Sequence, residues 1–245
     1  MRFSKWHALG NSYLLVEQRV EPDLVRRLCD VRYGIGSDGV LEVDGAEITV
    51  WNPDGSRAEF SGNGMRIAAA WLARRDRVDA VIVRTGGREY SARVADGLVE
   101  IDVGPVEVGE TETIQLSHER IELTIVSVGN PHAVLRREPL RGDLLRLGPL
   151  IERHPRFPDR TNVQLVRVDG PQEVTAAVWE RGAGETSASG SSAVAVAAAA
   201  IVNGWCDSPV TVRMPGGALE VGIDSEDVAT LRGPVAEIAR GELFA

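Results

Sequence analysis

Hydrophobic and polar positions alternate in many short runs along this chain, and most of these runs are bounded by glycine. Short alternating runs rich in β-branched residues predict β-strands. Glycine at both ends of a run is a turn signal, which supports the same interpretation. The predicted strands lie at residues 46–52, 79–85, 97–104, 122–129, 161–168, 174–180, 209–214 and 217–223.

Apolar residues at helical spacing predict helices at residues 64–75 and 192–203, and the same spacing, less regular, occurs at 21–29 and 140–153. The first two helices are apolar almost all round. This pattern is typical of a helix buried inside a unit, because a surface helix keeps one polar face. The fold class that follows is α/β (α+β), with strands more numerous than helices.

The chain also contains an internal repeat. Trp51 stands ten residues before Ser61, and Trp179 stands ten residues before Ser189. Each serine is followed by glycine and then by an alanine-rich helix, and a β run ending in a double glycine follows each helix. Self-similarity at so many positions indicates two copies of one structural unit.

We therefore predict two pseudo-symmetric domains, each with a β-rich sheet around a central helix. The first domain is assigned to residues 1–116, joined by the C-terminal tail 236–245. The second is assigned to residues 117–235. The 245 residues, 43% of them hydrophobic, are enough for each half to form its own core.

Composition narrows the class of partner. The net charge is −9 and no basic stripe is interleaved with aromatic residues, which argues against nucleic acid or an anionic membrane. No long apolar run or signal-peptide pattern occurs, so we expect a soluble, cytoplasmic protein that binds a small molecule. The two cysteines, Cys29 and Cys206, lack metal or disulfide spacing and are expected to be small buried hydrophobes.

The two serines stand where a helix N-cap would stand. The first turn of a helix leaves backbone N–H groups unpaired and carries partial positive charge, so it suits a carboxylate. Gly62 and Gly190 allow a ligand to come close to the backbone. A single Ser-Gly pair would be ordinary capping, but two such helix starts acting on one small anion would present Ser61 and Ser189 to its opposite faces. That arrangement suits racemisation or epimerisation, in which one group removes a proton and another returns it to the other face.

Other polar residues stand in motifs where a hydrophobic core needs none. Glu180 and Arg181 end an apolar run, which favours a role in a site. Turn formation explains Asn11 and Asn52 equally well, since asparagine favours turns. The further candidates are Asn130, His132 and Asn162.

Seven ordered blocks, covering nearly the whole chain, resemble the diaminopimelate epimerase family. The blocks are KWHALGNSYLLVE, RYGIGSDGV, WNPDGSRAEFSGNGMR, VSVGNPHAV, RTNVQLV, WERGAGETSASGSS and MPGGALEV. The resemblance implies two similar α/β domains, each a β-barrel-like sheet round a central helix. It further implies a homodimer that uses no metal and no cofactor, pyridoxal phosphate included.

The resemblance also implies residue roles and a reaction, the interconversion of LL- and meso-diaminopimelate in lysine and peptidoglycan biosynthesis. Ser61 and Ser189 would occupy the positions of the two catalytic bases, with His132 as a neighbour that assists them. The resemblance implies a substrate-binding role for Glu180, which we also count among the catalytic candidates because it could activate a serine hydroxyl. The implied substrate-binding residues are Asn11, Asn52, Gly62, Asn63, Asn130, Asn162, Arg181, Gly190 and Ser191.

This chain departs from the family pattern at both bases, where the family has cysteine. A thiol has a pKa near 8.5, whereas an alcohol titrates nearer to water at about 15.7, so the reactive anion is scarcer by about five or more orders of magnitude. The serines could be engineered, could be native and activated through His132 or Glu180, or could serve another reaction. Replacement at both positions favours a native variant. The alternative functions are a catalytically silent amino-acid-binding homologue and a cofactor-independent isomerase of another amino acid or an unsaturated acid.

Overall fold

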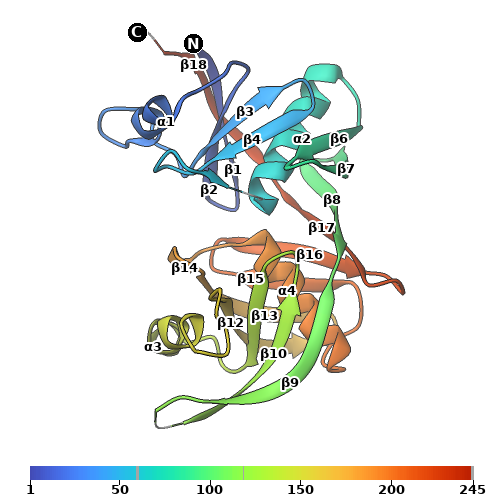
Figure 1. The fold of residues 1–245 in the computed structure, drawn as a ribbon. Helices are drawn as coiled ribbons and strands as arrows, with labels where there is room; N and C mark the ends of the chain where they lie inside the picture. The colour runs from blue at the N-terminus through green and yellow to red at the C-terminus, as the bar shows by residue number, and fades with distance from the viewer. Residues whose placement is uncertain (59–60, 118, 244–245) are drawn as a thin grey trace. The chain divides into compact units, whose positions relative to one another are not determined.

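The computed structural model describes residues 1–58, 61–117 and 119–243 of the chain, which form two compact units. Met1–Asp102 and Arg232–Ala245 make the first unit, and Val103–Leu231 make the second. Glu59 and Phe60 of the serine-containing block, and the last two residues of the tail, lie outside the described residues. The chain enters the second unit within β8 and leaves it within β17 (Figure 1).

The first unit combines two helices with mixed parallel and antiparallel strand pairings. Strand β1 pairs antiparallel with β2 and β18, and β2 pairs parallel with β3. Strand β4 pairs antiparallel with β3 and β5 and parallel with β6, and β7 pairs antiparallel with β6 and β8. Its elements are β1 (Arg2–Ala8), β2 (Asn11–Val16), α1 (Pro22–Cys29), β3 (Val40–Asp44), β4 (Glu47–Trp51), β5 (Arg57–Ala58), α2 (Gly62–Asp76), β6 (Ala80–Thr85), β7 (Arg88–Ala95), β8 (Leu98–Pro105) and β18 (Ala236–Glu242).

The second unit repeats this order of pairings. Strand β10 pairs antiparallel with β9 and β11, and β11 pairs parallel with β12 across a helix, as β2 does with β3. Strand β13 pairs antiparallel with β12 and β14 and parallel with β15, and β15 pairs antiparallel with β16. The elements are β9 (Glu107–Gln115), β10 (Arg120–Ser127), β11 (Pro131–Arg136), α3 (Arg141–Glu152), β12 (Asn162–Gly170), β13 (Glu173–Glu180), β14 (Gly184–Thr186), α4 (Gly190–Val202), β15 (Val210–Met214), β16 (Gly217–Ile223) and β17 (Val228–Pro234).

These elements confirm the predicted mixed α/β class. The boundary between the two units falls within β8, so β9 lies in the second unit, where it pairs with β10. Both alanine-rich helices begin two residues before their predicted starts, because the glycines after each serine already belong to the first turn. Glycine has low helix propensity, so the pattern of apolar residues did not extend to it.

Helices α2 and α4 are each surrounded by strands of their own unit. Helix α2 contacts β1, β2, β6 and β7, and α4 contacts β9, β10, β11, β12, β15 and β16 (Figure 1). Residues 67–70 of α2 and 193–200 of α4 are all buried. Alanine suits both helices, because its small side chain lets strands approach on several sides while it retains the highest helix propensity.

The tryptophans matched by the repeat play the same part in both units. The indole N–H of Trp51 donates to Glu42 Oε2 at 3.1 Å, and that of Trp179 donates to Glu152 Oε2 at 2.8 Å. Burial would raise the pKa of the Glu152 carboxyl, but the hydrogen bonds from Trp179 and the Gly182 backbone, together with the charges of Arg160 and Arg153, hold this pKa below its ordinary value. The two indoles are thus fixed by carboxylates from neighbouring elements of the same unit.

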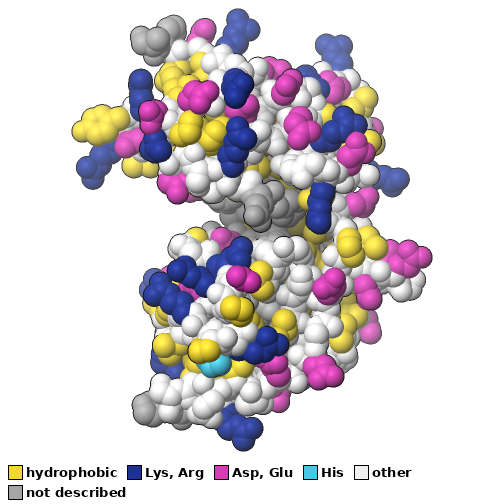
Figure 2. All heavy atoms as spheres, viewed as in Figure 1, with side chains coloured by type: hydrophobic (Ala, Val, Ile, Leu, Met, Phe, Trp, Pro, Cys, Tyr) yellow, Lys and Arg dark blue, Asp and Glu magenta, His cyan; other side chains and the backbone are white. Residues whose placement is uncertain are grey.

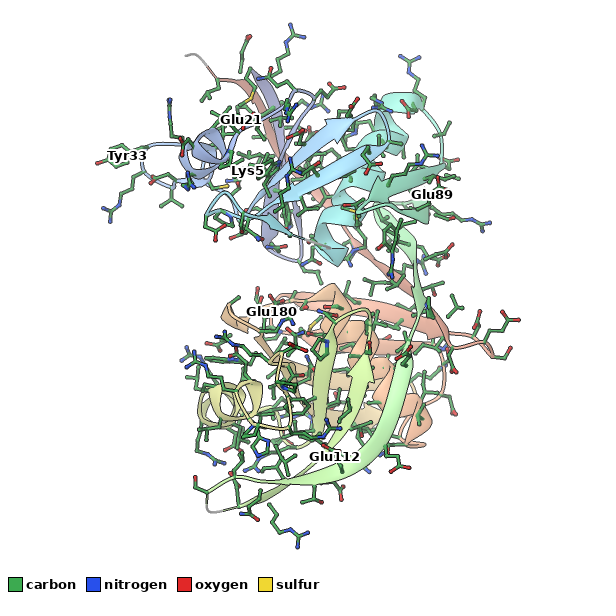
Figure 3. The ribbon with its side chains drawn as sticks, in the orientation of Figure 1. Lys5, Glu21, Tyr33, Glu89, Glu112 and Glu180 are labelled. Atoms are coloured by element: carbon green, nitrogen blue, oxygen red, sulfur yellow. The ribbon has the colours of Figure 1, made fainter. Side chains whose placement is uncertain are left out.

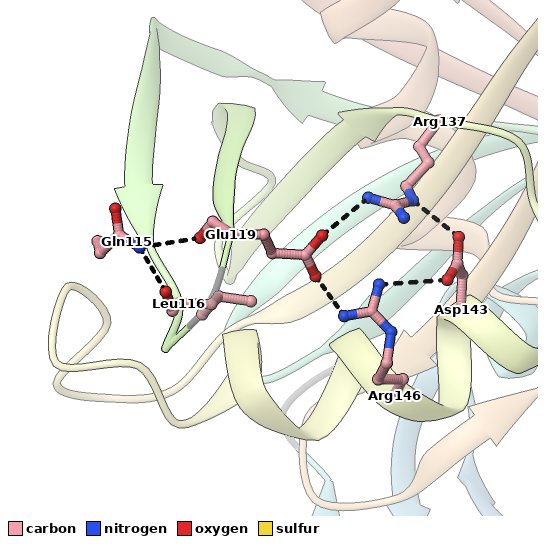
Figure 4. Close-up of polar contacts among 6 residues, drawn as sticks. All are labelled: Gln115, Leu116, Glu119, Arg137, Asp143 and Arg146. Carbon is pink, nitrogen blue, oxygen red and sulfur yellow. Dashed lines mark hydrogen bonds and ion pairs between the residues drawn. The ribbon is translucent and has the colours of Figure 1, made fainter.

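An ion network fastens helix α3 to the strands beneath it (Figure 4). Arg137, just after β11, donates to Asp143 at 2.8 Å and lies 3.7 Å from Glu119. Arg146 on α3 pairs with the same two carboxylates. Isolated surface ion pairs contribute little to stability, but four charges that share partners hold one another in place. The network joins α3 to Glu119, whose carbonyl also accepts a hydrogen bond from Gln115 Nε2 at 3.3 Å.

The surface carries both signs of charge. Figure 2 shows basic and acidic side chains interspersed over the visible face of each unit, in keeping with 27 basic and 36 acidic residues. Within the described part of the chain, no helix combines the length and the apolar character needed to span a membrane.

The packing of α3 on Trp179 leads to a paired test of stability. A Cβ at Gly148 would lie 2.6 Å from Trp179 Cγ, closer than real contacts allow, whereas a Cβ at Gly142 meets nothing within 4 Å. We expect Gly148→Ala to lower the free energy of unfolding by about 1–3 kcal/mol through overpacking. Gly142→Ala in the same helix should raise it by up to about 1 kcal/mol through helix propensity. Urea unfolding of both variants checks this, and equal effects would contradict the close packing of Gly148 on Trp179.

Candidate active site

Ser61 caps helix α2 with its side chain. Its backbone is extended (φ −140°, ψ 110°), and its Oγ accepts a hydrogen bond from the Gly64 N–H at 3.0 Å. The Tyr13 hydroxyl, on β2, lies 2.9 Å from the same Oγ. The N–H groups of Gly62 and Asn63 precede the first bond within the helix, from the Met65 N–H to the Ser61 carbonyl, so the helix itself offers them no acceptor.

A chain of side-chain hydrogen bonds runs along the start of α2. Arg66 Nη2 donates to Asn63 Oδ1 at 2.8 Å, and Asn63 Nδ2 donates to Asn11 Oδ1 at 3.2 Å. Arg66 is fully buried and Asn63 is 5% exposed. The structure thus brings together the predicted pair Asn11 and Asn63 and joins them to Arg66, for which the sequence analysis assigned no role.

Ser189 stands at the matched position before α4 but has a different partner. Its backbone is extended (φ −143°, ψ 125°), and its side chain makes no capping bond. Instead its hydroxyl lies beside the carboxyl of Glu180, at the end of β13, a position that Figure 3 labels. Burial raises the pKa of the Glu180 carboxyl, and the interaction with the Ser189 hydroxyl partly opposes this rise. A carboxylate with a raised pKa is a stronger proton acceptor than an ordinary one.

His132 lies fully buried in a polar network. Gln164 Nε2 donates to His132 Nδ1 at 3.0 Å and also to Ser192 Oγ at 3.0 Å. Because Nδ1 accepts, the proton of the neutral ring sits on Nε2, which donates to Asn130 Oδ1 at 3.0 Å. Burial, followed by the charge of Arg181, lowers the pKa of His132 to about 3. The imidazole is therefore neutral at physiological pH and holds Asn130 in place.

Asn162 and Arg181 meet in the second unit, whereas Asn52 serves its own turn. The backbone N–H of Arg181 donates to Asn162 Oδ1 at 2.9 Å, and Asn162 Nδ2 donates to the Pro131 carbonyl at 3.0 Å. Asn52 Nδ2 donates to Ser56 Oγ at 3.0 Å, and the Asn52 N–H donates to the Ser56 carbonyl at 2.8 Å. These contacts support the interpretation of Asn52 as a turn residue.

Of the remaining predicted residues, Gly190 is buried and Ser191 is half-buried in the first turn of α4.

Both cysteines are buried and unpaired, as expected of small hydrophobes. Cys29 packs in a core cluster of the first unit, and its Sγ lies 3.5 Å from Ser37 Oγ. Cys206 Sγ donates to the Gly170 carbonyl at 3.4 Å. Burial raises the pKa of both thiols. No group of three or more His, Cys, Asp or Glu among the described residues is arranged to hold a metal ion.

Four residues of these networks were missed by the sequence analysis: Tyr13, Arg66, Gln164 and Ser192. Arg66 and Gln164 carried a signal in the sequence, because each is a polar residue within an otherwise apolar run. The structure shows that both are fully buried. Tyr13 carried none, since a tyrosine in a strand is ordinary. Its contact with Ser61 joins residues 48 positions apart and depends on the tertiary fold.

A solved structure shares this two-unit fold. The crystal structure of a hydroxyproline epimerase from Agrobacterium vitis, with bound trans-4-hydroxy-L-proline, matches with a TM-score of 0.70. The match covers 99% of this chain and 90% of that chain at 16% identity, which establishes the fold alone. The architecture is thus one that an amino-acid epimerase also has.

Sequence comparison narrows the class to one family. The family model for diaminopimelate epimerase matches residues 3–109 and 124–238. Diaminopimelate epimerase 2 of a Nostoc species is 35% identical, with 99% of this chain and 95% of the relative covered. The diaminopimelate epimerase of Azotobacter vinelandii is 36% identical, with 99% of both covered. The chain therefore belongs to the diaminopimelate epimerase family, whose members are amino-acid epimerases independent of pyridoxal phosphate.

The neutral, buried state of His132 has a measurable consequence for stability. Its folded pKa of about 3 lies below the ordinary 6.5, so between these values the unfolded chain binds a proton that the folded chain does not. As far as His132 determines it, the free energy of unfolding is therefore highest above pH 6.5. It decreases by up to about 1.4 kcal/mol per pH unit as the pH falls towards 3. We expect His132→Gln to unfold with a shallower pH dependence than the wild type between pH 4 and 6. The partly exposed His154, changed to Gln, serves as the control, and equal slopes for the wild type and His132→Gln would refute the buried neutral state.

Proposed function

We propose that this protein interconverts LL- and meso-diaminopimelate by two-base proton transfer at the α-carbon, with Ser61 and Ser189 in the two base positions. The observation that carries the proposal is that the Ser189 hydroxyl lies beside the buried carboxyl of Glu180, whose pKa is raised. A serine hydroxyl alone is a very weak base, and an adjacent general base is the ordinary means of activating it. The full-length likeness to diaminopimelate epimerases supports the choice of substrate.

The proposed proton transfer on the Ser189 side is a relay. Ser189 Oγ takes the α-proton of the substrate while its own hydroxyl proton passes to the Glu180 carboxylate. The Cα–H bond and the old O–H bond break, and a new O–H bond forms on each of Ser189 and Glu180. The electron pair of the broken Cα–H bond enters the substrate carboxylate as an enolate-like charge, which in this proposal is stabilised by the first N–H groups of α4, from Gly190 and Ser191.

The proposed return of the proton comes from Ser61. Its hydroxyl donates a proton to the other face of the α-carbon, and the adjacent Tyr13 hydroxyl, 2.9 Å away, resupplies it. A phenol releases its proton more readily than an alcohol does, which suits the Tyr13 hydroxyl to this supply. In the opposite direction Ser61 accepts the α-proton while its own proton moves to a Tyr13 phenolate.

The rest of the predicted site receives binding roles in this proposal. The N–H groups of Gly62 and Asn63 hold the carboxylate at the start of α2. Asn11, Asn52, Asn130, Asn162 and Arg181 bind the remaining polar groups of diaminopimelate. His132, being neutral and tied to Asn130 and Gln164, orients Asn130 and takes no proton from the substrate.

Exchange of the α-proton with solvent deuterium is the direct test. With millimolar LL-diaminopimelate in D₂O, followed by NMR or mass spectrometry, we expect slow but measurable deuterium incorporation. The double variant Ser61→Cys/Ser189→Cys should accelerate it by about 100-fold or more, because a thiol supplies far more of its reactive anion at neutral pH.

The possible results separate the functions. Absence of exchange in the wild type would refute turnover of this substrate. If diaminopimelate then raised the melting temperature, the protein would be a silent amino-acid-binding homologue. Exchange on other amino or unsaturated acids, without exchange on diaminopimelate, would identify a different isomerase.

The role of Glu180 has its own test, in which Glu180→Gln keeps the shape of the side chain and removes its basicity. We expect exchange to fall by about 100-fold or more, the usual contribution of a positioned general base. Glu185→Gln is the control, because Glu185 lies five residues further on and pairs with Arg141 on α3. An equal loss in both variants, or no loss in Glu180→Gln, would exclude the relay.

A further inference from the structure

Arg66 is a charged residue in an unusual place. Its side chain is fully buried on α2, a helix whose neighbouring positions 65 and 67–69 are completely buried apolar residues. Arginine is almost never fully buried unless it is paired with an acidic group. Arg66 has one hydrogen-bond partner, Asn63 Oδ1, and among the residues that the structure describes its Nε and Nη1 have none.

The guanidinium keeps its charge in this environment. Burial lowers the pKa of Arg66 to about 10, which still leaves it protonated at neutral pH. A buried charge without a counter-ion is costly, and replacing such groups with apolar residues of similar volume often stabilises a protein. Something other than the stability of the free protein must therefore account for a cation here.

The internal repeat shows that the fold does not require this cation. Arg66 follows Ser61 by five residues, and the residue that follows Ser189 by five is Val194, which is completely buried in α4. Two helices with the same strand pairings around them thus carry an arginine and a valine at the same position. The difference between them is chemical rather than architectural.

The guanidinium is directed at the start of its helix. By bonding to Asn63 Oδ1 it reaches back to the first turn of α2, where the N–H groups of Gly62 and Asn63 lie. The bond also fixes the orientation of the Asn63 amide, whose Nδ2 is then turned to Asn11. A full positive charge is thereby added to the partial charge of the helix start, and both act in a buried environment that screens them weakly.

We propose that Arg66 is the counter-charge for a carboxylate bound at the start of α2, and that it acts through Asn63 as a positioning residue. This inference rests on the proposed function in one respect, that the ligand carries a carboxylate. It adds a full positive charge to the N–H groups at the start of α2, beyond what the N–H groups at the start of α4 can offer. The start of α4, where Glu180 lies beside Ser189, has no such cation at the matched position.

The test uses the full chain, sodium acetate as the probe at constant ionic strength, and three variants. Arg66→Met removes the charge and keeps most of the volume, Arg66→Lys keeps the charge, and Arg74→Met removes one charge from the exposed end of the same helix. The readouts are the melting temperature with and without acetate and the NMR signal of the Arg66 Nε–H, which is the signal that Arg66→Lys abolishes.

We expect acetate to shift the Arg66 Nε–H signal and the Asn63 side-chain amide signals of the wild type to saturation. Arg66→Met should weaken acetate binding by about tenfold or more, the size of one charge-assisted interaction. Its melting temperature without acetate should equal or exceed that of the wild type, the opposite of what a purely structural arginine would give. Arg66→Lys should bind acetate within about threefold of the wild type, because it retains the charge, and Arg74→Met should match the wild type.

Two results would overturn the inference: no acetate response in the wild type, or undiminished acetate binding in Arg66→Met. If Arg66→Met does not fold, the wild-type signals and the affinity of Arg66→Lys decide the matter, and loss of binding in the lysine variant would count against a counter-charge. Acetate binding with no α-proton exchange on diaminopimelate would leave Arg66 in its role and refute the proposed turnover.

Discussion

Both central helices start among buried residues, and this constraint governs the surrounding structure. The first backbone N–H groups of a helix have no carbonyl within it, and a buried N–H without an acceptor is costly. Ser61 satisfies one of these groups at the start of α2, where Gly62, Asn63 and Gly64 are all buried. Those that remain have no acceptor within the helix, and in the proposed site a carboxylate would supply one. The glycines and serines at the helix starts suit that proposal, because they keep the helix start buried and leave its backbone within reach of a ligand.

The two units share one order of strand pairings, but their matched serines have different partners. Their strand pairings follow the same order, and each has a tryptophan tied to a carboxylate ten residues before its serine. The serines differ, however, in that Ser61 accepts from a backbone N–H and lies against a phenol, while Ser189 lies beside the carboxyl of Glu180. The repeat therefore preserves the fold of each unit, while the chemical surroundings of the two serines differ.

The sequence predicted the elements better than the contacts between them. The alanine-rich helices were found within two residues of their ends, because residues that are apolar all round mark a buried helix. The candidate residues Asn11 with Asn63, and Glu180 with Ser189, do meet in the structure, since each pair stands at ends of elements that the repeat had already marked. The partners of Ser61 and His132 were not predictable, because Tyr13 and Gln164 sit on strands whose register only the tertiary fold fixes. Asn52 shows the converse, a motif residue whose visible bonds belong to its own turn.

The pairing of β1 with β18 joins the first strand to be synthesised to the last. That pairing joins Arg2 to Glu242, and the Met1 amino group also bonds to the Leu243 carbonyl. The second unit is one continuous segment, whereas the first is made of two segments separated by all of the second. During synthesis the second unit can complete its strands while the first still has β1 without one neighbour. The half of the molecule that is made first is therefore the half that finishes folding last, and truncation at the C-terminus would be felt at the N-terminal strand.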